Sequence, residues 1–347
     1  MNLFFRRKPT EPPAMTLEGV LGPNSRLDEA RATLVDRPDA LAVAADGRLL
    51  FSSDRTVYTL AAWGETPEIW GRFEQPVSAL AASPGGLVAV GLTGGGIRIH
   101  DMSGQPLDWT IPASAGNAAD CLFLSEDEIA LVDHGYAPGE DVLAVATWDE
   151  ATHGNVVAVT RDGRIRTIAR DLRCPMGISP GEAGEVLVSE LETARILDLA
   201  GKIRRRGLPA YLGRIRKVEG GYLLAGLSRR DPLIEFLKTE KDFVAEMKAT
   251  INPRHWISPR SNPEFSHDFP IELGATRLFG EIKPWAPSFS YGLLIMLDDD
   301  LMPVGSAQSR ANGRRHAISD ATIWQGETIA VSKASGEILN LGAGVRS

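Results

Sequence analysis

The chain has 347 residues, of which 43% are hydrophobic and 24% are charged, and its formal net charge at pH 7 is −8. This composition is ordinary for a soluble globular protein and argues against extensive disorder and against a membrane-embedded fold. The acidic balance also argues against a nucleic-acid partner, because binding to phosphates requires a clustered Lys and Arg surface.

The chain begins with MNLFFRRKPTEPPAM, which has charges and prolines where a signal peptide would have an apolar run. No later apolar run reaches the roughly 18 residues of a membrane span. Residues 1–35 are predicted to be an N-terminal extension and residues 36–347 a single domain. Two cysteines, Cys121 and Cys174, cannot form a disulfide framework. We therefore expect a cytoplasmic protein with no membrane partner.

A short strand repeat occurs six times between Asp39 and Leu341. Each copy has a polar residue, a short apolar strand, a turn with Gly or Asp, and a second apolar strand. The copies begin, in chain order, at Asp39, Ser78, Asp120, Cys174, Gly213 and Ser319. Most starts are about 40 residues apart, which is the length of a four-stranded propeller blade. The sequence therefore predicts an all-β fold, a six-bladed β-propeller.

Two helical insertions are predicted, in blades three and five. The first covers about residues 134–154 and has a weak helical period. The second covers about residues 231–290 and starts with an amphipathic helix over residues 231–250. The rest of the second insertion is rich in proline and aromatic residues, so it either covers the channel mouth or fastens to the side of the blade. Trp256 and Trp285 are its candidate ligand-binding residues.

The first polar residues of the six copies are predicted to surround the mouth of the central channel, where side chains can hold a metal ion or a ligand. Ser78 and Ser319 are candidate binding residues, although they could instead cap strands and bond to nearby backbone. The basic residues 202–206 and 214–217 are expected to form a solvated blade edge. Arg214 is nevertheless also a candidate for ligand binding.

Several stretches resemble the strictosidine synthase-like proteins, which are relatives of the gluconolactonase, regucalcin and paraoxonase propellers. They are LRCPMGISPGEAGEVLVSELETARILDL, GGYLLAGLSRRDPLIEFL, and FSYGLLIMLDDDLMPV followed by ISDATIWQGETIAVS. The likeness covers roughly residues 36–342. It implies a six-bladed propeller that acts on a small molecule. A propeller hosts unrelated chemistries, so the resemblance implies the fold more strongly than the activity.

The metal-dependent lactonases of this superfamily hold a central Ca²⁺ with a Glu, two Asn and an Asp. The matching positions here are Asp39, Asp120, Cys174 and Gly213. Calcium requires about six to eight oxygen ligands, and a thiol and a glycine supply none from their side chains. We therefore expect no cofactor, or a weakly held divalent cation such as Ca²⁺ at Asp39 and Asp120. Zinc with Cys174 is a further alternative.

Strictosidine synthase itself lacks this metal set and uses a Glu in the sixth blade, for which Ser319 stands here. The neighbouring Asp320 is expected to point to the opposite face of its strand. A Cys174 or Ser319 nucleophile with His316 or His134 as base is another hypothesis, although a lone histidine is more often a surface or satisfied core residue.

The predicted catalytic residues are Asp39, Asp120, Cys174 and His316. The predicted binding residues are Ser78, Ser319, His134, Arg214, Trp256 and Trp285. The first functional hypothesis is a hydrolase that acts on a small lactone or ester. The alternatives are a non-catalytic propeller that binds a small molecule and, third, a metal-independent enzyme that forms or cleaves carbon–nitrogen bonds.

Overall fold

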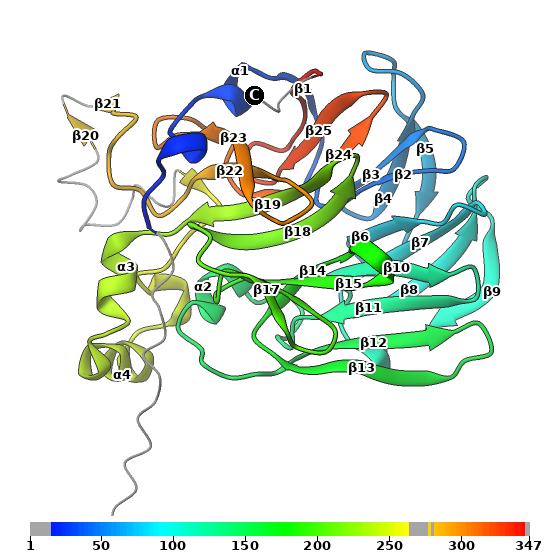
Figure 1. Cartoon of the computed structure of the whole chain (residues 1–347), viewed down its shortest axis with the longest axis horizontal. Coiled ribbons are helices and arrows are strands. Elements are labelled where there is room, and N and C mark those ends of the chain that lie inside the picture. The colour runs from blue at the N-terminus through cyan, green and yellow to red at the C-terminus, as the bar shows by residue number, and fades with distance from the viewer. Residues whose placement is uncertain (1–14, 264–276, 279–280, 344–347) are drawn as a thin grey trace, which may run out of the picture.

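The six sequence repeats supply the inner strands of six four-stranded antiparallel sheets, which are arranged around a central channel (Figure 1). The computed structural model describes residues 15–263, 277–278 and 281–343. The predicted six-bladed β-propeller is confirmed.

The first three blades follow one another along the chain, with each inner strand first and each outer strand last. Blade one consists of β2 Leu41–Val43, β3 Leu49–Ser53, β4 Thr56–Leu60 and β5 Glu68–Arg72. Blade two consists of β6 Val77–Ala82, β7 Leu87–Leu92, β8 Gly96–Asp101 and β9 Pro106–Ile111. Blade three consists of β10 Asp120–Ser125, β11 Glu128–Asp133, β12 Gly154–Thr160 and β13 Ile165–Leu172.

Blades four and five continue this order, whereas blade six takes its outer strand from the N-terminal part of the chain. Blade four consists of β14 Pro175–Pro180, β15 Val186–Glu190, β16 Arg195–Asp198 and β17 Ile203–Arg205. Blade five consists of β18 Ala210–Val218, β19 Gly221–Arg229, β22 Gly292–Leu297 and β23 Pro303–Ser309. Blade six consists of β24 Ile318–Trp324, β25 Glu327–Ser332, β26 Glu337–Asn340 and β1 Arg31–Leu34.

The hydrophobic core lies between neighbouring blades. One cluster, for example, joins Leu50 and Val57 of blade one to Leu80 and Val90 of blade two. The strands are runs of aliphatic residues that fit such a two-sided environment, and the turns between them use residues that accept positive φ. Gly86, in the turn between β6 and β7, has a φ of 92°.

The propeller is closed by β1, which pairs antiparallel with β26 in blade six. The boundary expected at residue 36 therefore falls after a strand that belongs to the propeller. A four-residue strand with three exposed residues carries little hydrophobic pattern, which is why the sequence did not reveal it.

A buried arginine fastens the N-terminal segment to blade six. Nη1 of Arg315 donates to the carbonyl oxygens of Leu27 and Ala30, both at 2.7 Å. Nε of the same residue donates to Oε2 of Glu337 on β26 at 3.0 Å. The Arg315 and Glu337 side chains are only 10% and 8% exposed. Their ion pair is therefore little screened by solvent.

The two predicted insertions contain the longer helices. Blade three carries α2 Val142–Ala146, and blade five carries α3 Pro232–Leu237 and α4 Lys241–Thr250. The single helix expected over residues 231–250 is thus two helices. Thr239 lies at the break and its hydroxyl donates to the carbonyl oxygen of Phe236 at 2.7 Å, an interaction that competes with continued helix.

The two insertions share a small hydrophobic core beside the propeller, where α3 and α4 lie together (Figure 1). Its buried members are Trp148, Ile234, Met247, Trp256 and Phe289. Nε1 of Trp148 also donates to Oγ of Ser258 at 2.7 Å. The described parts of both insertions thus form one unit rather than two separate decorations.

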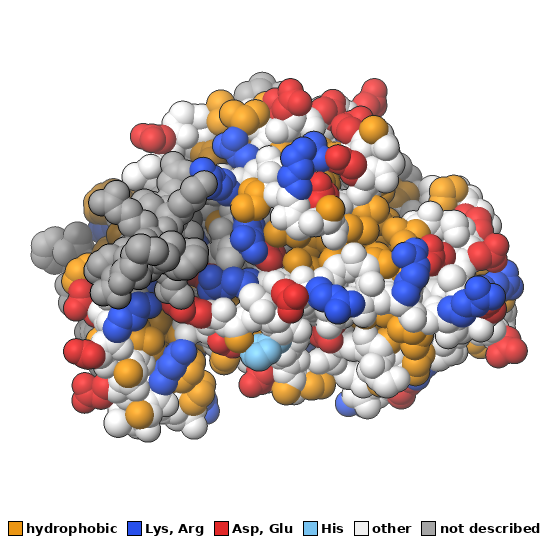
Figure 2. All heavy atoms as spheres, turned by 60° about the horizontal axis from the view of Figure 1, so that its bottom comes forward, with side chains coloured by type: hydrophobic (Ala, Val, Ile, Leu, Met, Phe, Trp, Pro, Cys, Tyr) orange, Lys and Arg blue, Asp and Glu red, His pale blue; other side chains and the backbone are white. Residues whose placement is uncertain are grey.

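The remaining elements are short. They are α1 Arg26–Glu29, β20 Arg277–Leu278, β21 Glu281–Ile282 and the 3-10 helices Gly19–Leu21, Ala113–Ala115, Glu182–Gly184 and Pro253–His255. Within the described ranges, every helix is too short or too polar to cross a membrane. Basic and acidic side chains are interspersed over the face shown in Figure 2.

We predict that Arg315→Met lowers the free energy of unfolding by about 3–5 kcal/mol, because it leaves the Glu337 carboxylate buried without its partner. Urea denaturation measures this change. Arg31→Ala is the control, since Arg31 pairs with Glu327 at the surface of the same blade and its loss should cost about 1 kcal/mol or less. Equal losses in the two variants would contradict the prediction.

Candidate functional site

A pocket of about 280 Å³ lies at one mouth of the central channel and is lined by residues from all six blades. The blades contribute Asp39, Ser78, Ala119, Met176, Arg214 and Ser319, in chain order. The insertion of blade three adds residues 137–143, which form one wall. The pocket is therefore a product of the closed propeller and not of any single repeat.

β-Bulges in the inner strands direct side chains toward this pocket. In blades two, four and six, one extra residue interrupts the pairing of the inner strand: Ser78, Met176 and Ser319 respectively. In blade five the interruption covers Gly213 and Arg214. A β-bulge turns a side chain out of the regular alternation, and all of these bulged residues line the pocket.

Two of the six residues predicted to surround the channel mouth, Cys174 and Asp120, do not line the pocket. Cys174 precedes its bulge by two residues, has a φ of 50° and packs with Leu143 and Tyr211 in a hydrophobic cluster. Leu143 of this cluster lines the pocket, whereas Cys174 does not. Burial raises the pKa of its thiol, which disfavours the thiolate that a nucleophile needs. In blade three Ala119 lines the pocket, and the carboxyl of Asp120 points into the channel below it.

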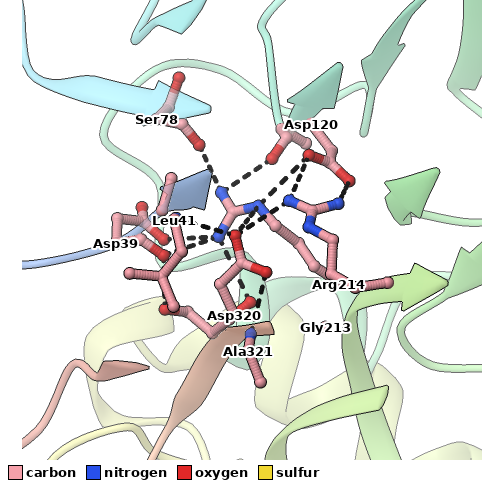
Figure 3. A network of polar contacts seen from close by, with 12 residues as sticks. Asp39, Leu41, Ser78, Asp120, Gly213, Arg214, Asp320 and Ala321 are labelled. Carbon is pink, nitrogen blue, oxygen red and sulfur yellow. Dashed lines mark hydrogen bonds and ion pairs between the residues drawn. The ribbon is translucent and has the colours of Figure 1, made fainter. Parts of the chain in front are cut away.

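Arg214 occupies the centre of the channel mouth (Figure 3). Its Nη1 donates to the carbonyl oxygen and Oδ1 of Asp39, at 2.8 and 3.0 Å, and to the carbonyl oxygen of Ser319 at 3.3 Å. Its Nη2 donates to the carbonyl oxygens of Ser78 and of Ala119, the latter at 2.9 Å. One side chain of blade five thus binds the backbone of four other blades.

A second arginine lies one layer deeper in the channel. Arg216 binds both carboxylate oxygens of Asp120, at 2.6 and 2.9 Å, and Oδ2 of Asp320 at 2.9 Å. Asp320 therefore points into the channel, and the expectation that it faces away was wrong because the bulge at Ser319 reverses the alternation. The expectation that residues 214–217 form a solvated edge was also wrong for Arg214 and Arg216, whose side chains are only 6% and 17% exposed.

The charges of this network shift the pKa values of its members. Burial alone would raise the pKa of Asp39, but Lys333 and Arg214 outweigh it and hold this pKa below its ordinary value. Burial is the largest influence on Asp320 and raises its pKa, although both arginines oppose this. Burial likewise disfavours a charged Arg214, but the three carboxylates raise its pKa. The guanidinium is therefore a permanent cation.

The polar groups that face the pocket include a second ion pair. Nζ of Lys333 donates to Oδ2 of Asp39 at 2.8 Å, and the Lys333 side chain is 42% exposed. Sequence reasoning missed Lys333. The signal was present, because Thr93, His134 and Lys333 each follow the second strand of their blade and all three line the pocket.

His134 is held in one tautomer. Its Nδ1 accepts a hydrogen bond from the backbone N–H of Tyr136 at 3.0 Å. The proton of the neutral ring is therefore on Nε2, and the ring is a hydrogen-bond donor rather than a base. Burial lowers the pKa of His134, which keeps the ring neutral near pH 7.

His316 and the two predicted tryptophans do not line the pocket. His316 is fully buried, with Nε2 2.9 Å from the carbonyl oxygen of Arg310 and Nδ1 3.0 Å from Oγ of Ser290. Since a carbonyl can only accept, Nε2 carries the proton. Trp256 lies in the shared core of the insertions, and Trp285 is 70% exposed.

The predicted nucleophile–base pairs are not assembled. The Ser319 hydroxyl donates to the carbonyl oxygen of Asp39 at 2.7 Å, and Cys174 does not line the pocket. In the part of the chain that the structure describes, no pocket hydroxyl or thiol has a hydrogen bond to a histidine.

The residues at the channel mouth do not fit a resident calcium ion. The carbonyl oxygens that could ligate it already accept hydrogen bonds from Arg214. Among residues 15–263, 277–278 and 281–343, no group of three or more His, Cys, Asp or Glu side chains is arranged to hold a metal. The cation at this place is the guanidinium group of Arg214.

Comparison with family models gives no match, and comparison with curated proteins gives none. Solved structures are similar over most of the chain. A gluconolactonase from Xanthomonas campestris has a TM-score of 0.52 at 14% identity, with 96% of this chain and 95% of that chain covered. The PQQ-bound aldose sugar dehydrogenase from Streptomyces coelicolor has a TM-score of 0.51 at 12% identity, with 90% and 95% covered. These TM-scores and coverages show a shared fold.

We predict that Asp39→Asn flattens the acid side of the stability curve. The folded-state pKa of Asp39 is lowered, so its ionised form stabilises the fold above its ordinary pKa of 3.8, and this contribution is lost as the pH falls below that value. Urea denaturation from pH 7 to pH 3 should show a smaller loss for the variant than for the wild type. Asp108→Asn, at an exposed position of β9, is the control. Parallel curves for wild type and Asp39→Asn would refute this assignment.

Proposed function

We propose that the protein binds a small, uncharged molecule with hydroxyl groups at the mouth of its central channel. The observation that carries this proposal is the hydroxyl of Ser78, which lines the pocket, is buried and has no hydrogen-bond partner among the described residues. A buried polar group without a partner costs free energy, so a hydroxyl at this place is well suited to bind a ligand.

The charge balance favours an uncharged ligand. Three carboxylates (Asp39, Asp120 and Asp320) are matched by two guanidinium groups and the ammonium of Lys333. The floor of the pocket therefore carries no net charge. On the rim, the carboxylates of Glu140 and Asp141 oppose an anionic ligand.

The other pocket groups suit a molecule of this kind. The neutral ring of His134 offers Nε2–H as a donor, and Asn117, whose Nδ2 donates to the carbonyl oxygen of Tyr136, retains its Oδ1 as an acceptor. Leu143 and Leu227 supply apolar surface. A volume of about 280 Å³ is at the lower end for ligand pockets, which favours a ligand of roughly monosaccharide size.

A second candidate is metal-independent hydrolysis of a lactone or ester, and the pair of Asp39 and Lys333 favours it. The ammonium of Lys333 could donate to a substrate carbonyl oxygen, while the ionised Asp39 could orient a water molecule. Asp39 would be a weak general base because its pKa is lowered. The gluconolactonase from Xanthomonas campestris shares the fold and makes a lactone a reasonable probe.

The test uses D-glucono-1,5-lactone as the uncharged probe and gluconate as its charged counterpart. Calorimetric titration measures binding, and proton release at constant pH above the rate without protein measures catalysed hydrolysis, with and without EDTA. We expect the lactone to bind at least tenfold more tightly than gluconate. Ser78→Ala should weaken binding of the lactone by about fivefold to tenfold, which corresponds to one hydrogen bond of about 1 kcal/mol. Equal binding of lactone and gluconate, or no effect of Ser78→Ala, would refute the proposal.

Ser103→Ala, in an exposed turn of blade two, is the matched control and should leave binding unchanged. Hydrolysis that persists in EDTA and falls at least tenfold in Lys333→Gln would establish the second candidate. Binding without proton release above the rate of the uncatalysed reaction would establish a binder alone. Hydrolysis that EDTA abolishes would contradict the proposal that hydrolysis at this site needs no metal ion.

A further inference from the structure

A second hollow, of about 540 Å³, lies beside the propeller, where the two insertions meet blade four. Arg173 and Glu192, which flank strands β14 and β15, line one side of it. Phe236 of α3 and Lys238, which follows α3, line another side, and Figure 1 shows where this helix lies. The hollow shares no lining residue with the pocket at the channel mouth. It is therefore a separate place, and its volume is ordinary for a site that binds a small molecule.

An ion cluster with more cations than carboxylates borders this hollow. Nη2 of Arg173 lies 2.7 Å from Oε2 of Glu192, and Nζ of Lys238 contacts Oε1 of the same carboxylate. Nη1 of Arg230, whose side chain is 1% exposed, lies 3.3 Å from Oε1 of Glu235. The side chains of Glu192 and Glu235 are buried or nearly so. Three cations therefore face two carboxylates in a place that has little solvent.

The charged groups around the cluster do not remove this excess. Lys241 and Glu150 also line the hollow, but they pair with each other at 3.2 Å and are largely exposed. Four further groups beside the cluster cancel one another's charge: Asp149, Lys248, Arg229 and Asp231. An unbalanced charge in a buried place costs free energy unless a counter-ion joins it. The hollow therefore favours an anion.

The cluster also has more hydrogen-bond donors than acceptors. Nε of Arg173, and both Nε and Nη1 of Arg230, are buried and have no hydrogen-bond partner among the residues that the structure describes. Both carboxylate oxygens of Glu192 already contact cations. Oε1 of Glu235 accepts from the hydroxyl of Tyr211 at 3.2 Å. An acceptor is therefore the group that the cluster lacks.

Apolar side chains lie next to these cations. Phe236 is 58% exposed although it lines the hollow, and Pro232 and Val244 line it as well. Trp148 lines it from the shared core of the insertions, where its Nε1 donates to Oγ of Ser258. A ligand with an aromatic or aliphatic part would remove this surface from water, which is favourable.

We propose that this hollow binds a small monocarboxylate that carries an aromatic or aliphatic part. Its carboxylate lies between Arg173 and Lys238, whose partly exposed side chains reach the hollow. Its apolar part packs against Phe236 and Val244. One negative charge balances the cluster, whereas a dianion such as phosphate would reverse its sign. The proposal does not depend on the function proposed for the channel mouth.

The test uses 3-phenylpropionate as the probe, 3-phenylpropanamide as its neutral counterpart, and acetate as an anion without an apolar part. Calorimetric titration of the full-length protein measures binding. We expect the probe to bind roughly tenfold more tightly than either, because a factor of ten is about 1.4 kcal/mol, which one charge-assisted hydrogen bond or one buried aromatic ring can supply. Equal binding of amide and probe, or of acetate and probe, would overturn the proposal. So would the absence of probe binding in the millimolar range.

Arg173→Met tests the charge and should weaken binding of the probe by roughly tenfold. The variant should still fold, because two cations then remain for the two carboxylates, and thermal unfolding checks this. Arg173→Lys keeps the charge and should bind almost as tightly as the wild type. Arg170→Met, at an exposed position of β13, is the matched control and should bind normally. Undiminished binding in Arg173→Met would overturn the proposal, and should that variant not fold, the neutral amide still decides whether the site requires a charge.

Phe236→Ser tests the apolar part at an exposed position, where the fold is not at risk. It should weaken binding of 3-phenylpropionate by roughly fivefold, whereas Ile165→Ser, an exposed apolar position of blade three, should not. Ser78→Ala should leave binding of this probe unchanged, since Ser78 lines only the channel pocket. Unchanged binding in Phe236→Ser, or weaker binding in Ser78→Ala, would place the probe elsewhere and overturn the proposal.

Discussion

A buried cluster of guanidinium and oxygen groups joins the inner ends of the blades, and the arrangement of the channel depends on it. Arg214 binds the backbone of blades one, two, three and six. Arg216 links Asp120 of blade three to Asp320 of blade six, and Asp120 in turn accepts from Ile178 of blade four. Buried charges persist only when they are paired and hydrogen-bonded, so the six inner strands must keep a common register for this cluster to exist.

The same cluster limits the chemistry of the pocket above it. Because backbone carbonyls occupy the Nη1 and Nη2 donors of Arg214, the centre of the site lacks a free electrophile. The donors around the edge include those of Ser78, His134 and Lys333. A shared fold does not by itself carry an activity. The activity must be argued from the groups at the edge.

Much of the fold was accessible from the sequence, while the site was accessible only in part. The six copies of the repeat predicted the blades, and the two insertions were found at the correct blades. Alignment of the copies also brought Asp39, Ser78 and Ser319 to the pocket. It placed Cys174 there in place of Met176, because an alignment by first polar residue cannot detect an extra residue in an inner strand.

The sequence by itself determined the number of blades and the position of the insertions, since strand length, turn residues and repeat spacing are local properties of the chain. Only the tertiary structure decided that Arg214 and Arg216 lie in the channel and that β1 closes the sixth blade. A basic residue on a strand is normally solvated, and it can be buried only where carboxylates and carbonyls from other blades surround it. Those partners are up to 175 residues away in the chain, so no local pattern records their approach.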